Sequence, residues 1–187
     1  QAKFLNGTYK VLQIAPVGRR IDVWVVNPPL GGQGYGAPAD LVLPQMELTL
    51  AAKVTYNWQP VSYKKVTFEI MQISGEDPKL WKVEWDDTCD DGHAYCIFRM
   101  PWTGHTAEEL LGKWRVWVSV TLADVVIRDF MDFDYDYLIR ILGVRTDKPE
   151  YMKCNDVTIT VDYATKSKRM HDVTMYVTIQ DELGVPI

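Results

Sequence analysis

Hydrophobic and polar residues alternate along most of this chain of 187 residues. A period of two is typical of β-strands with one buried face, because successive side chains of a strand point to opposite sides of the sheet. In residues 65–73 (KVTFEIMQI), for example, Val66, Phe68 and Ile70 fall on one face. The alternation predicts strands within residues 9–16, 20–26, 46–56, 65–73, 80–85, 94–100, 113–127, 128–141, 156–163 and 172–181.

Turn signals separate these strands. Residues 27–40 (NPPLGGQGYGAPAD) are rich in Gly and Pro and have no periodicity, so they are predicted to form a long loop. One helical turn is predicted at residues 105–112 (HTAEELLG), where Thr106 and Glu109 have the spacing of a capping box and Gly112 follows as a stop. Long helices do not alternate with the strands, which excludes a parallel α/β fold. The sequence therefore predicts an all-β sandwich.

Composition and charge narrow the classes of function. The formal net charge is −5. A mildly acidic chain is a poor candidate for binding nucleic acid, which requires clustered Lys and Arg. The longest cationic cluster, residues 166–169 (KSKR), is predicted to be a solvated loop. No apolar run approaches the roughly 18–20 residues that span a bilayer, so no membrane span is predicted. The chain begins at Gln1 without a Met or a signal peptide, which indicates processing and favours export.

Residues 85–98 (WDDTCDDGHAYCIF) gather the side chains most capable of chemistry. One interpretation is a zinc site formed by Cys89, His93 and Cys96, but their spacing is not a standard zinc motif. A second is an irregular calcium site, because calcium prefers oxygen ligands. Its candidate ligands are Asp86, Asp87, Asp90 and Asp91.

The favoured interpretation of the same stretch is a β-hairpin tip. Asp91-Gly92 is a strong turn dipeptide, because Gly accepts a positive φ. Cys89 and Cys96 would then lie on opposite strands, and a cross-strand disulfide is predicted. Such a bond would require an oxidising compartment and would leave Cys154 as the third, unpaired cysteine.

No catalytic residues are predicted. Asp132, Asp134 and Asp136 alternate with aromatic residues, which predicts an acidic solvent face, with a cation site or a charged subunit interface as alternatives. Carboxylates at i and i+2 of one strand do not form the opposed pair of a glycosidase. Motifs for hydrolases, metalloproteases and nucleotide binding are missing. We therefore expect no enzyme and no cofactor except a structural calcium ion.

Sequence motifs in residues 37–141 suggest a family. They are Pro-Gln-x-x-x-x-Leu at 44–50, Val-Thr-Tyr at 54–56, Phe-Arg-x-Pro at 98–101 and Gly-x-Trp-x-Val at 112–116. This segment resembles a repeated immunoglobulin-like module of large archaeal exported cell-surface proteins. Residues 143–187 look like the opening half of a second module, of the macroglobulin-like or bacterial-Ig-like kind. The resemblance implies an extracellular, structural or adhesive role and assigns no catalytic residue.

The expected organisation follows from this resemblance. Residues 1–26 are an N-terminal assembly segment, residues 27–142 an Ig-like β-sandwich, and residues 143–187 a partial second domain. A complete Ig-like sandwich needs about 100 residues, so the partial domain would have open strand edges. We expect the strands of residues 9–26 to complete the partial domain of a neighbouring copy. Repetition of this head-to-tail contact would build a homopolymer, such as a filament or surface layer.

The alternative function is an adhesin or carbohydrate-binding module that contacts cell-surface glycans. Trp24, Tyr35 and Trp58, in or near predicted loops, could stack on sugar rings. Asn6, within Asn6-Gly7-Thr8, is a candidate glycosylation site. Both functions place the protein at the cell surface.

Overall fold

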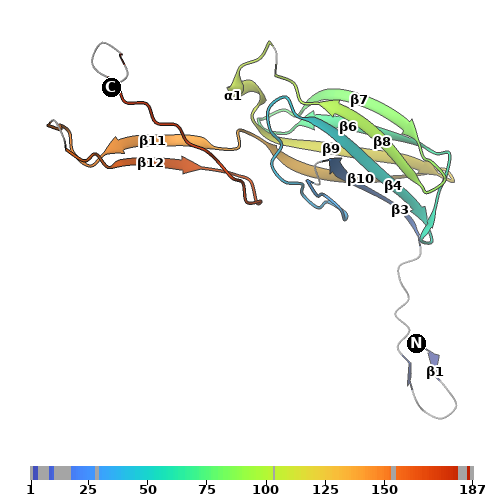
Figure 1. The fold of residues 1–187 in the computed structure, drawn as a ribbon. Coiled ribbons are helices and arrows are strands. Elements are labelled where there is room, and N and C mark those ends of the chain that lie inside the picture. The colour runs from blue at the N-terminus through green and yellow to red at the C-terminus, as the bar shows by residue number, and fades with distance from the viewer. Residues whose placement is uncertain are drawn as a thin grey trace.

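The computed structural model describes residues 2–3, 9–10, 18–27, 30–102, 104–152, 155–180 and 185. Apart from a short strand pair at residues 2–3 and 9–10, they form two parts, a β-sandwich and a smaller C-terminal unit that extends away from it (Figure 1). The predicted all-β class is therefore confirmed. In the part of the chain that the structure covers, no helix has the length and apolar character needed to cross a membrane.

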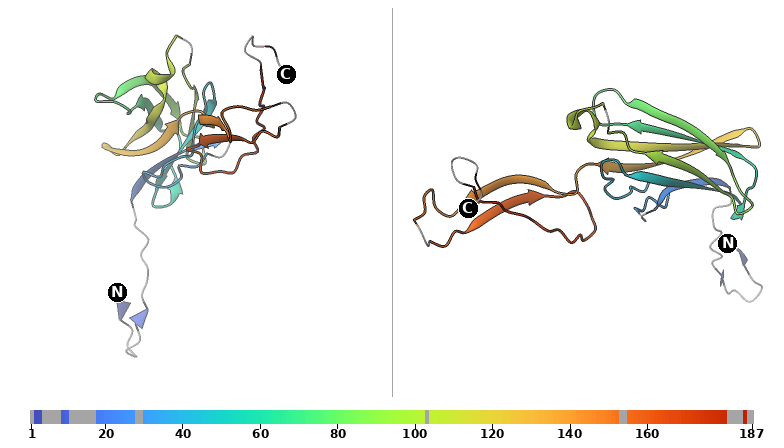
Figure 2. Two further views of the ribbon diagram at one scale, coloured as in Figure 1. Left: turned by 90° about the vertical axis from the view of Figure 1, so that its left-hand side faces the viewer. Right: turned by 45° about the horizontal axis from the view of Figure 1, so that its top comes forward.

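The sandwich consists of two antiparallel sheets that lie face to face (Figure 2). The first sheet contains β3 (Arg19–Asn27), β4 (Glu47–Tyr56), β5 (Gln59–Pro60) and β8 (His93–Arg99). β4 pairs with β3 on one side and with β5 and β8 on the other. The second sheet has the order β10-β9-β6-β7, built from β10 (Val125–Tyr135), β9 (Gly112–Leu122), β6 (Lys65–Gln72) and β7 (Lys79–Asp87).

The core lies between the two sheets and follows the period-two pattern. Val66, Phe68 and Ile70 are each 0% exposed, as the alternation predicts. Trp114 is also fully buried, and its Nε1 donates a hydrogen bond of 3.0 Å to the carbonyl of Leu110. Each fully buried apolar side chain stabilises the fold by about 1.5–3 kcal/mol.

The predicted helical turn is confirmed as α1 (Ala107–Leu110). The amide of Glu109 donates to the carbonyl of Thr106, and Gly112 follows with a φ of 133°. The predicted boundary between strands 113–127 and 128–141 is wrong. β9 and β10 instead meet at a two-residue turn, Ala123-Asp124, in which both residues have positive φ. β10 ends at Tyr135, and the C-terminal unit begins at residue 140.

The N-terminal organisation also differs from the prediction. β1 (Ala2–Lys3) pairs with β2 (Tyr9–Lys10). Residues 19–27 form β3 and pair with β4 of the same chain, so the predicted domain boundary after Val26 is wrong. These residues cannot be donated to a neighbouring copy unless the sandwich loses a strand. Asn6 and most of the predicted strand 9–16 lie outside the described residues.

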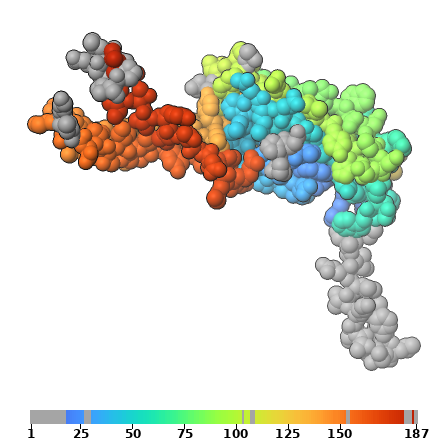
Figure 3. Space-filling view, in the orientation of Figure 1, coloured from blue at the N-terminus to red at the C-terminus, as the bar shows by residue number. Residues whose placement is uncertain are grey.

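Among its described residues, the C-terminal unit contains one strand pair, β11 (Arg140–Thr146) with β12 (Ile159–Ala164). Figure 3 shows this unit, in orange and red, projecting from the sandwich. A strand is predicted at 172–181, but residues 172–179 form no strand and are all exposed. Alternation gives a segment the ability to form a strand, whereas the strand itself needs a hydrogen-bonding partner.

Candidate functional site

The turn after β7 connects the two sheets. β7 pairs with β6 in the second sheet, whereas β8 pairs with β4 in the first, so the predicted β7–β8 hairpin is wrong. The turn itself is tight: the amide of Gly92 donates to the carbonyl of Cys89, and the amide of Cys89 donates to the carbonyl of His93. Gly92 has a φ of 79°, and a Cβ there would lie 2.6 Å from the carbonyl oxygen of Val54. The prediction of a Gly-dependent turn is therefore confirmed, although its strands do not pair.

The predicted disulfide is wrong, because Cys89 and Cys96 are both free thiols. Cys96 lies on β8 opposite Leu50 and faces the core, 5% exposed. Cys89 lies in the turn and is exposed. Burial raises the pKa of the Cys96 thiol to about 11. Cys154 lies outside the described residues.

The four aspartates of this stretch make separate local contacts. The Asp86 carboxylate accepts a hydrogen bond of 2.8 Å from the amide of Tyr95. Asp90 accepts one of 2.8 Å from the Tyr63 hydroxyl, and Asp91 lies 3.0 Å from Nδ1 of His93. Asp87 is exposed at the end of β7. Within the described ranges, His, Cys, Asp and Glu residues do not gather in groups of three or more that could hold a metal ion.

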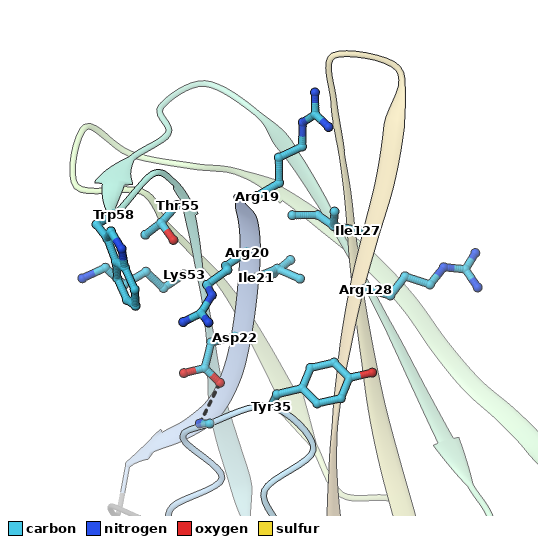
Figure 4. A pocket seen from close by; sticks show the side chains of 11 residues that line it. Arg19, Arg20, Ile21, Asp22, Tyr35, Lys53, Thr55, Trp58, Ile127 and Arg128 are labelled. Carbon is cyan, nitrogen blue, oxygen red and sulfur yellow. Dashed lines mark hydrogen bonds between the residues drawn. The ribbon is translucent and has the colours of Figure 1, made fainter. Parts of the chain in front are cut away.

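A cleft on the β3 side of the sandwich gathers cations and aromatic rings, and we call it the basic cleft (Figure 4). It has a volume of about 670 Å³, within the range of about 300–1,000 Å³ that is usual for ligand pockets. Its walls come from β3, β4, β10, the loop after β3 and the turn after β4. The lining residues are Arg19, Arg20, Ile21, Asp22, Gly34, Tyr35, Lys53, Thr55, Trp58, Ile127 and Arg128.

Strand pairing explains how this set comes together. On β3 and β4, Arg20 lies opposite Thr55, and Asp22 lies opposite Lys53. These positions point outward because their neighbours on β3, Ile21 and Val23, are buried in the core. The cleft therefore combines outward-facing residues of β3 and β4 with residues of the opposite face, Arg19 and Ile21, at the edge where β3 meets β10.

Trp58 dominates one end of the basic cleft. It is 54% exposed, and the Arg20 guanidinium lies 4.7 Å from its ring centroid. Asn57 and Trp58 form a two-residue turn in which both φ values are positive, 50° and 69°. This is the geometry that Asn-Gly favours, and the left-handed conformation costs a residue with a side chain about 1–2 kcal/mol. The chain thus holds an exposed tryptophan on a strained backbone at the rim of the cleft.

The loop after β3 places Tyr35 at the other side of the cleft. The Asp22 carboxylate accepts a hydrogen bond of 2.9 Å from the amide of Gly34. Asp129, fully buried on β10, accepts from the amides of Gly36 at 3.0 Å and Val23 at 3.2 Å. Burial is the main cause that raises the pKa of Asp129. Tyr35 lies between these two tethered glycines and is 79% exposed.

The sequence identified part of this site. Tyr35 and Trp58, two of the three aromatic residues predicted to stack on sugars, line the same cleft. Trp24 does not, since its ring packs edge-on against His93 with centroids 5.7 Å apart. Sequence reasoning missed the cations and Asp129, because β3, β4 and β10 are far apart along the chain. Asp129 stands between apolar positions at 127 and 131, and that break in the pattern was the available signal.

A second polar cluster, which we call the clasp, joins the C-terminal unit to the sandwich. Asp136 is 1% exposed, and its carboxylate contacts Arg140 at 2.6 Å and Lys166 at 2.9 Å. Asp40 is 8% exposed and accepts hydrogen bonds of 2.7 Å from Arg169 and 2.9 Å from the amide of Lys168.

The clasp bears on two predictions. Residues 166–169 form a largely exposed loop, as predicted, but the side chains of Lys166 and Arg169 also contact two buried carboxylates. The predicted acidic solvent face is wrong for Asp136, which is buried, whereas Asp132 is partly exposed and pairs with Arg115 at 2.6 Å. Burial alone would raise the pKa of Asp136, but hydrogen bonds from Lys166 and Arg140 outweigh it and lower the pKa.

Comparison with known proteins gives no family. Neither a family model nor a curated protein sequence matches this chain. The solved structures that match include the sporulation control protein Spo0M of Bacillus subtilis, at 10% identity and a TM-score of 0.38, covering 81% of this chain and 69% of that protein. A CARDB domain of a Pyrococcus furiosus protein, solved in complex with di-metal ions, matches at 14% identity and a TM-score of 0.34. The match covers 68% of this chain and 100% of the CARDB domain.

An engineered protein also matches, at 15% identity and a TM-score of 0.35 over 63% of this chain. The chain spans about 20% of that protein's length. These likenesses are too distant to assign a function. What the structure establishes is an all-β, two-sheet sandwich with a second β-unit attached.

Proposed function

We propose that this protein is a structural module of an extracellular cell-surface assembly, in which copies join by exchange of β-strands between their C-terminal units. The observation that carries the proposal is an exposed, strand-forming segment beside an exposed apolar strand pair. This retains the function that the sequence suggested and moves the joint from the N-terminal strands to residues 140–180.

The apolar surface of the C-terminal unit is large for so small an element. On β11, Ile141, Leu142 and Val144 are 61%, 67% and 61% exposed. An isolated two-stranded hairpin is marginally stable in water, and it needs further strands or a packing partner to bury an apolar face. Exposed apolar surface of this extent is typical of an interaction site.

The same unit holds a segment suited to cover that surface. Val173, Met175, Val177 and Ile179 alternate with polar or aromatic residues and would share one face of a strand. These four side chains are between 43% and 52% exposed. Each copy therefore offers both an apolar strand pair and an unpaired strand, and an exchange between copies would satisfy both.

The occupant of the apolar strand pair is thus a second copy of this chain. Addition of a strand to an open edge gains backbone hydrogen bonds, and the alternating side chains fix the register. If the exchange is reciprocal it produces a closed dimer, and if it runs head-to-tail it produces a fibre. Light scattering and negative-stain microscopy of the purified chain distinguish these two products.

Val177→Asp tests the strand exchange, because it places a charge in the middle of the apolar face. Val83→Asp is the matched control, since Val83 is as exposed as Val177, at 52%, but lies on β7 of the sandwich. We expect the wild type and Val83→Asp to assemble and Val177→Asp to remain monomeric. A monomeric wild type, or assembly of Val177→Asp like that of the wild type, would refute the proposal.

A second candidate function is supported by a separate observation. Tyr35 and Trp58 are both exposed and line one cleft together with several cations. Paired exposed aromatic rings favour a carbohydrate-binding module. This function is compatible with the first, because the basic cleft lies on the sandwich and the exposed strands lie on the C-terminal unit.

A further inference from the structure

We infer that the basic cleft binds an acidic saccharide, a sugar that carries a carboxylate or sulfate group. The inference rests on the carbohydrate-binding function proposed above and names its ligand class. It is independent of the proposed assembly.

The charges of the cleft favour an anionic ligand. The whole chain has a formal net charge of −5, yet four cations and one carboxylate line the cleft. Arg19, Arg20, Lys53 and Arg128 make no ion pair with any residue that the structure describes. The side chains of Lys166, Arg169, Arg140 and Arg115, in contrast, all contact carboxylates. Cations without ion-pair partners around one cleft attract an anionic ligand.

The single carboxylate of the cleft does not neutralise these cations. Asp22 lies opposite Lys53 on the neighbouring strand, where an ion pair would be expected. Its oxygen instead accepts the hydrogen bond from the amide of Gly34, and no ion pair with Lys53 forms. Asp22 therefore serves to hold the loop, and the Lys53 ammonium group stays available to a ligand.

The aromatic rings indicate what carries the negative charge. Trp58 and Tyr35 present exposed flat apolar faces at the rim, and a sugar ring offers a flat C–H face to such surfaces. The Arg20 guanidinium lies over the Trp58 ring, which places a donor of paired hydrogen bonds next to the stacking surface. Since Arg20 covers one face of the indole, a sugar ring would stack on the other face and bring its acidic group around the edge of the indole to Arg20.

The strained turn strengthens this assignment. Gly would fit the backbone of position 58 better than any other residue, so a tryptophan there is unfavourable for folding. A residue held in a sparsely populated conformation is typical of ligand-binding sites, where the strain has a use. Trp58 is also exposed and adds nothing to the core cluster.

The shape of the cleft argues against a nucleic acid. Proteins that bind single strands use a long positively charged groove that follows many phosphates. The basic cleft is instead a single depression of about 670 Å³. A short acidic oligosaccharide fits a site of this size, whereas most of an extended polyanion would lie outside the cleft.

The test is a titration of the full chain, at low ionic strength, with oligogalacturonate and with a neutral galactose oligomer of equal length. Calorimetry reports tight binding, and NMR titration at millimolar sugar detects weak binding. Inorganic sulfate and an oligothymidylate serve as further probes. We expect binding of the oligogalacturonate alone, weakened by added salt because the cleft charges are exposed.

The possible outcomes distinguish a failure of the acidic specificity from a failure of the carbohydrate-binding function. Equal binding of the neutral oligomer would overturn the acidic specificity but keep the carbohydrate-binding function. Binding of no sugar would overturn both. Equal or tighter binding of sulfate or oligothymidylate would show that the cleft recognises anions without a sugar.

Two variants locate the site. Trp58→Gly turns Asn57-Trp58 into Asn-Gly, so it keeps or improves the turn while it removes the stacking ring. Trp85→Ala is the matched control, because Trp85 is 58% exposed with a cation, Lys65, 4.0 Å from its ring centroid, but lies outside the cleft. We expect about a tenfold loss of affinity for Trp58→Gly and for Arg20→Gln, from the loss of stacking and of a charge-assisted contact. Unchanged affinity in both variants, or an equal loss in Trp85→Ala, would refute the site.

Discussion

The clasp should control how firmly the C-terminal unit is held on the sandwich. We predict that Lys166→Ala loosens this unit and leaves the core of the sandwich intact. The Lys166 ammonium group lies 2.9 Å from the Asp136 carboxylate, which is only 1% exposed. Removal of Lys166 leaves that buried charge with Arg140 as its remaining cation.

The magnitude follows from the contacts. A hydrogen bond to a charged group contributes about 1.5–3 kcal/mol, and the loss of one partner of a buried ion pair costs about 3–5 kcal/mol when nothing replaces it. Arg140 still pairs with Asp136, and the Lys166 side chain is 51% exposed, so water screens part of the interaction. We therefore expect Lys166→Ala to weaken the docking of the C-terminal unit by about 1–2 kcal/mol.

Hydrogen–deuterium exchange measures this change at the level of single segments. An opening equilibrium shifted by 1.4 kcal/mol exchanges about tenfold faster. The peptide that contains β12 should exchange faster in Lys166→Ala, whereas the peptide of β6 should be unchanged. Lys113→Ala provides the control, because Lys113 is exposed at the start of β9. Equal exchange of β12 in Lys166→Ala and the wild type would show that this ion pair does not hold the unit.

Three further predictions address pH, turn strain and thiol chemistry. The pKa values of Asp40 and Asp136 lie below their ordinary value of 3.8, so the stabilisation from the clasp is fully present above pH 3.8 and is lost as the pH falls through these lowered values. The protection of β12, which is the slowing of its exchange relative to the intrinsic rate at each pH, should therefore fall only in that acid range; equal protection there and above pH 3.8 would contradict the role of the two carboxylates. Asp124→Gly should stabilise the sandwich by about 0.5–1 kcal/mol in chemical denaturation, because Asp124 has a φ of 64° in the two-residue β9–β10 turn. Asp124→Ala should not stabilise it, and a gain in stability from Asp124→Ala equal to that from Asp124→Gly would contradict the explanation by backbone strain. In a Cys154→Ser variant at pH 8, the exposed Cys89 should react rapidly with a thiol reagent. Cys96 should react only on unfolding, because it is buried and its pKa is about 11. Rapid reaction of both thiols would contradict the burial of Cys96.

The period-two pattern was a reliable guide to strands and to their inward faces. It correctly placed Val66, Phe68 and Ile70 in the core, and the Asp91-Gly92 dipeptide correctly marked the turn at Gly92. It could not say which sheet a strand joins, because alternation is the same for any partner. That is why β7 and β8 were predicted as a hairpin and why a disulfide between Cys89 and Cys96 was expected.

The functional residues were harder to predict for a related reason. The basic cleft combines side chains from five separate segments, and only the pairing of β3 with β4 and the closeness of β10 bring them together. The clasp was missed because residues 166–169 have the composition of a solvated loop, and their partners, Asp40 and Asp136, are distant in sequence. Tyr35 and Trp58 were recognised because large aromatic residues beside turns stand out without a structure.

The clasp also determines how the molecule would respond to force. The chain leaves the sandwich after Tyr135, forms β11 and β12, and returns to touch the sandwich again through residues 166–169. The C-terminal unit is therefore fixed at two places, one covalent and one ionic, so bending and twisting at the joint must break contacts with Asp40 or Asp136. In an assembly linked through this unit, tension would reach the ion pairs before it reached the strand ladders of the sandwich. The joint would yield first and re-form when the load is removed, which would let the assembly flex without unfolding its domains.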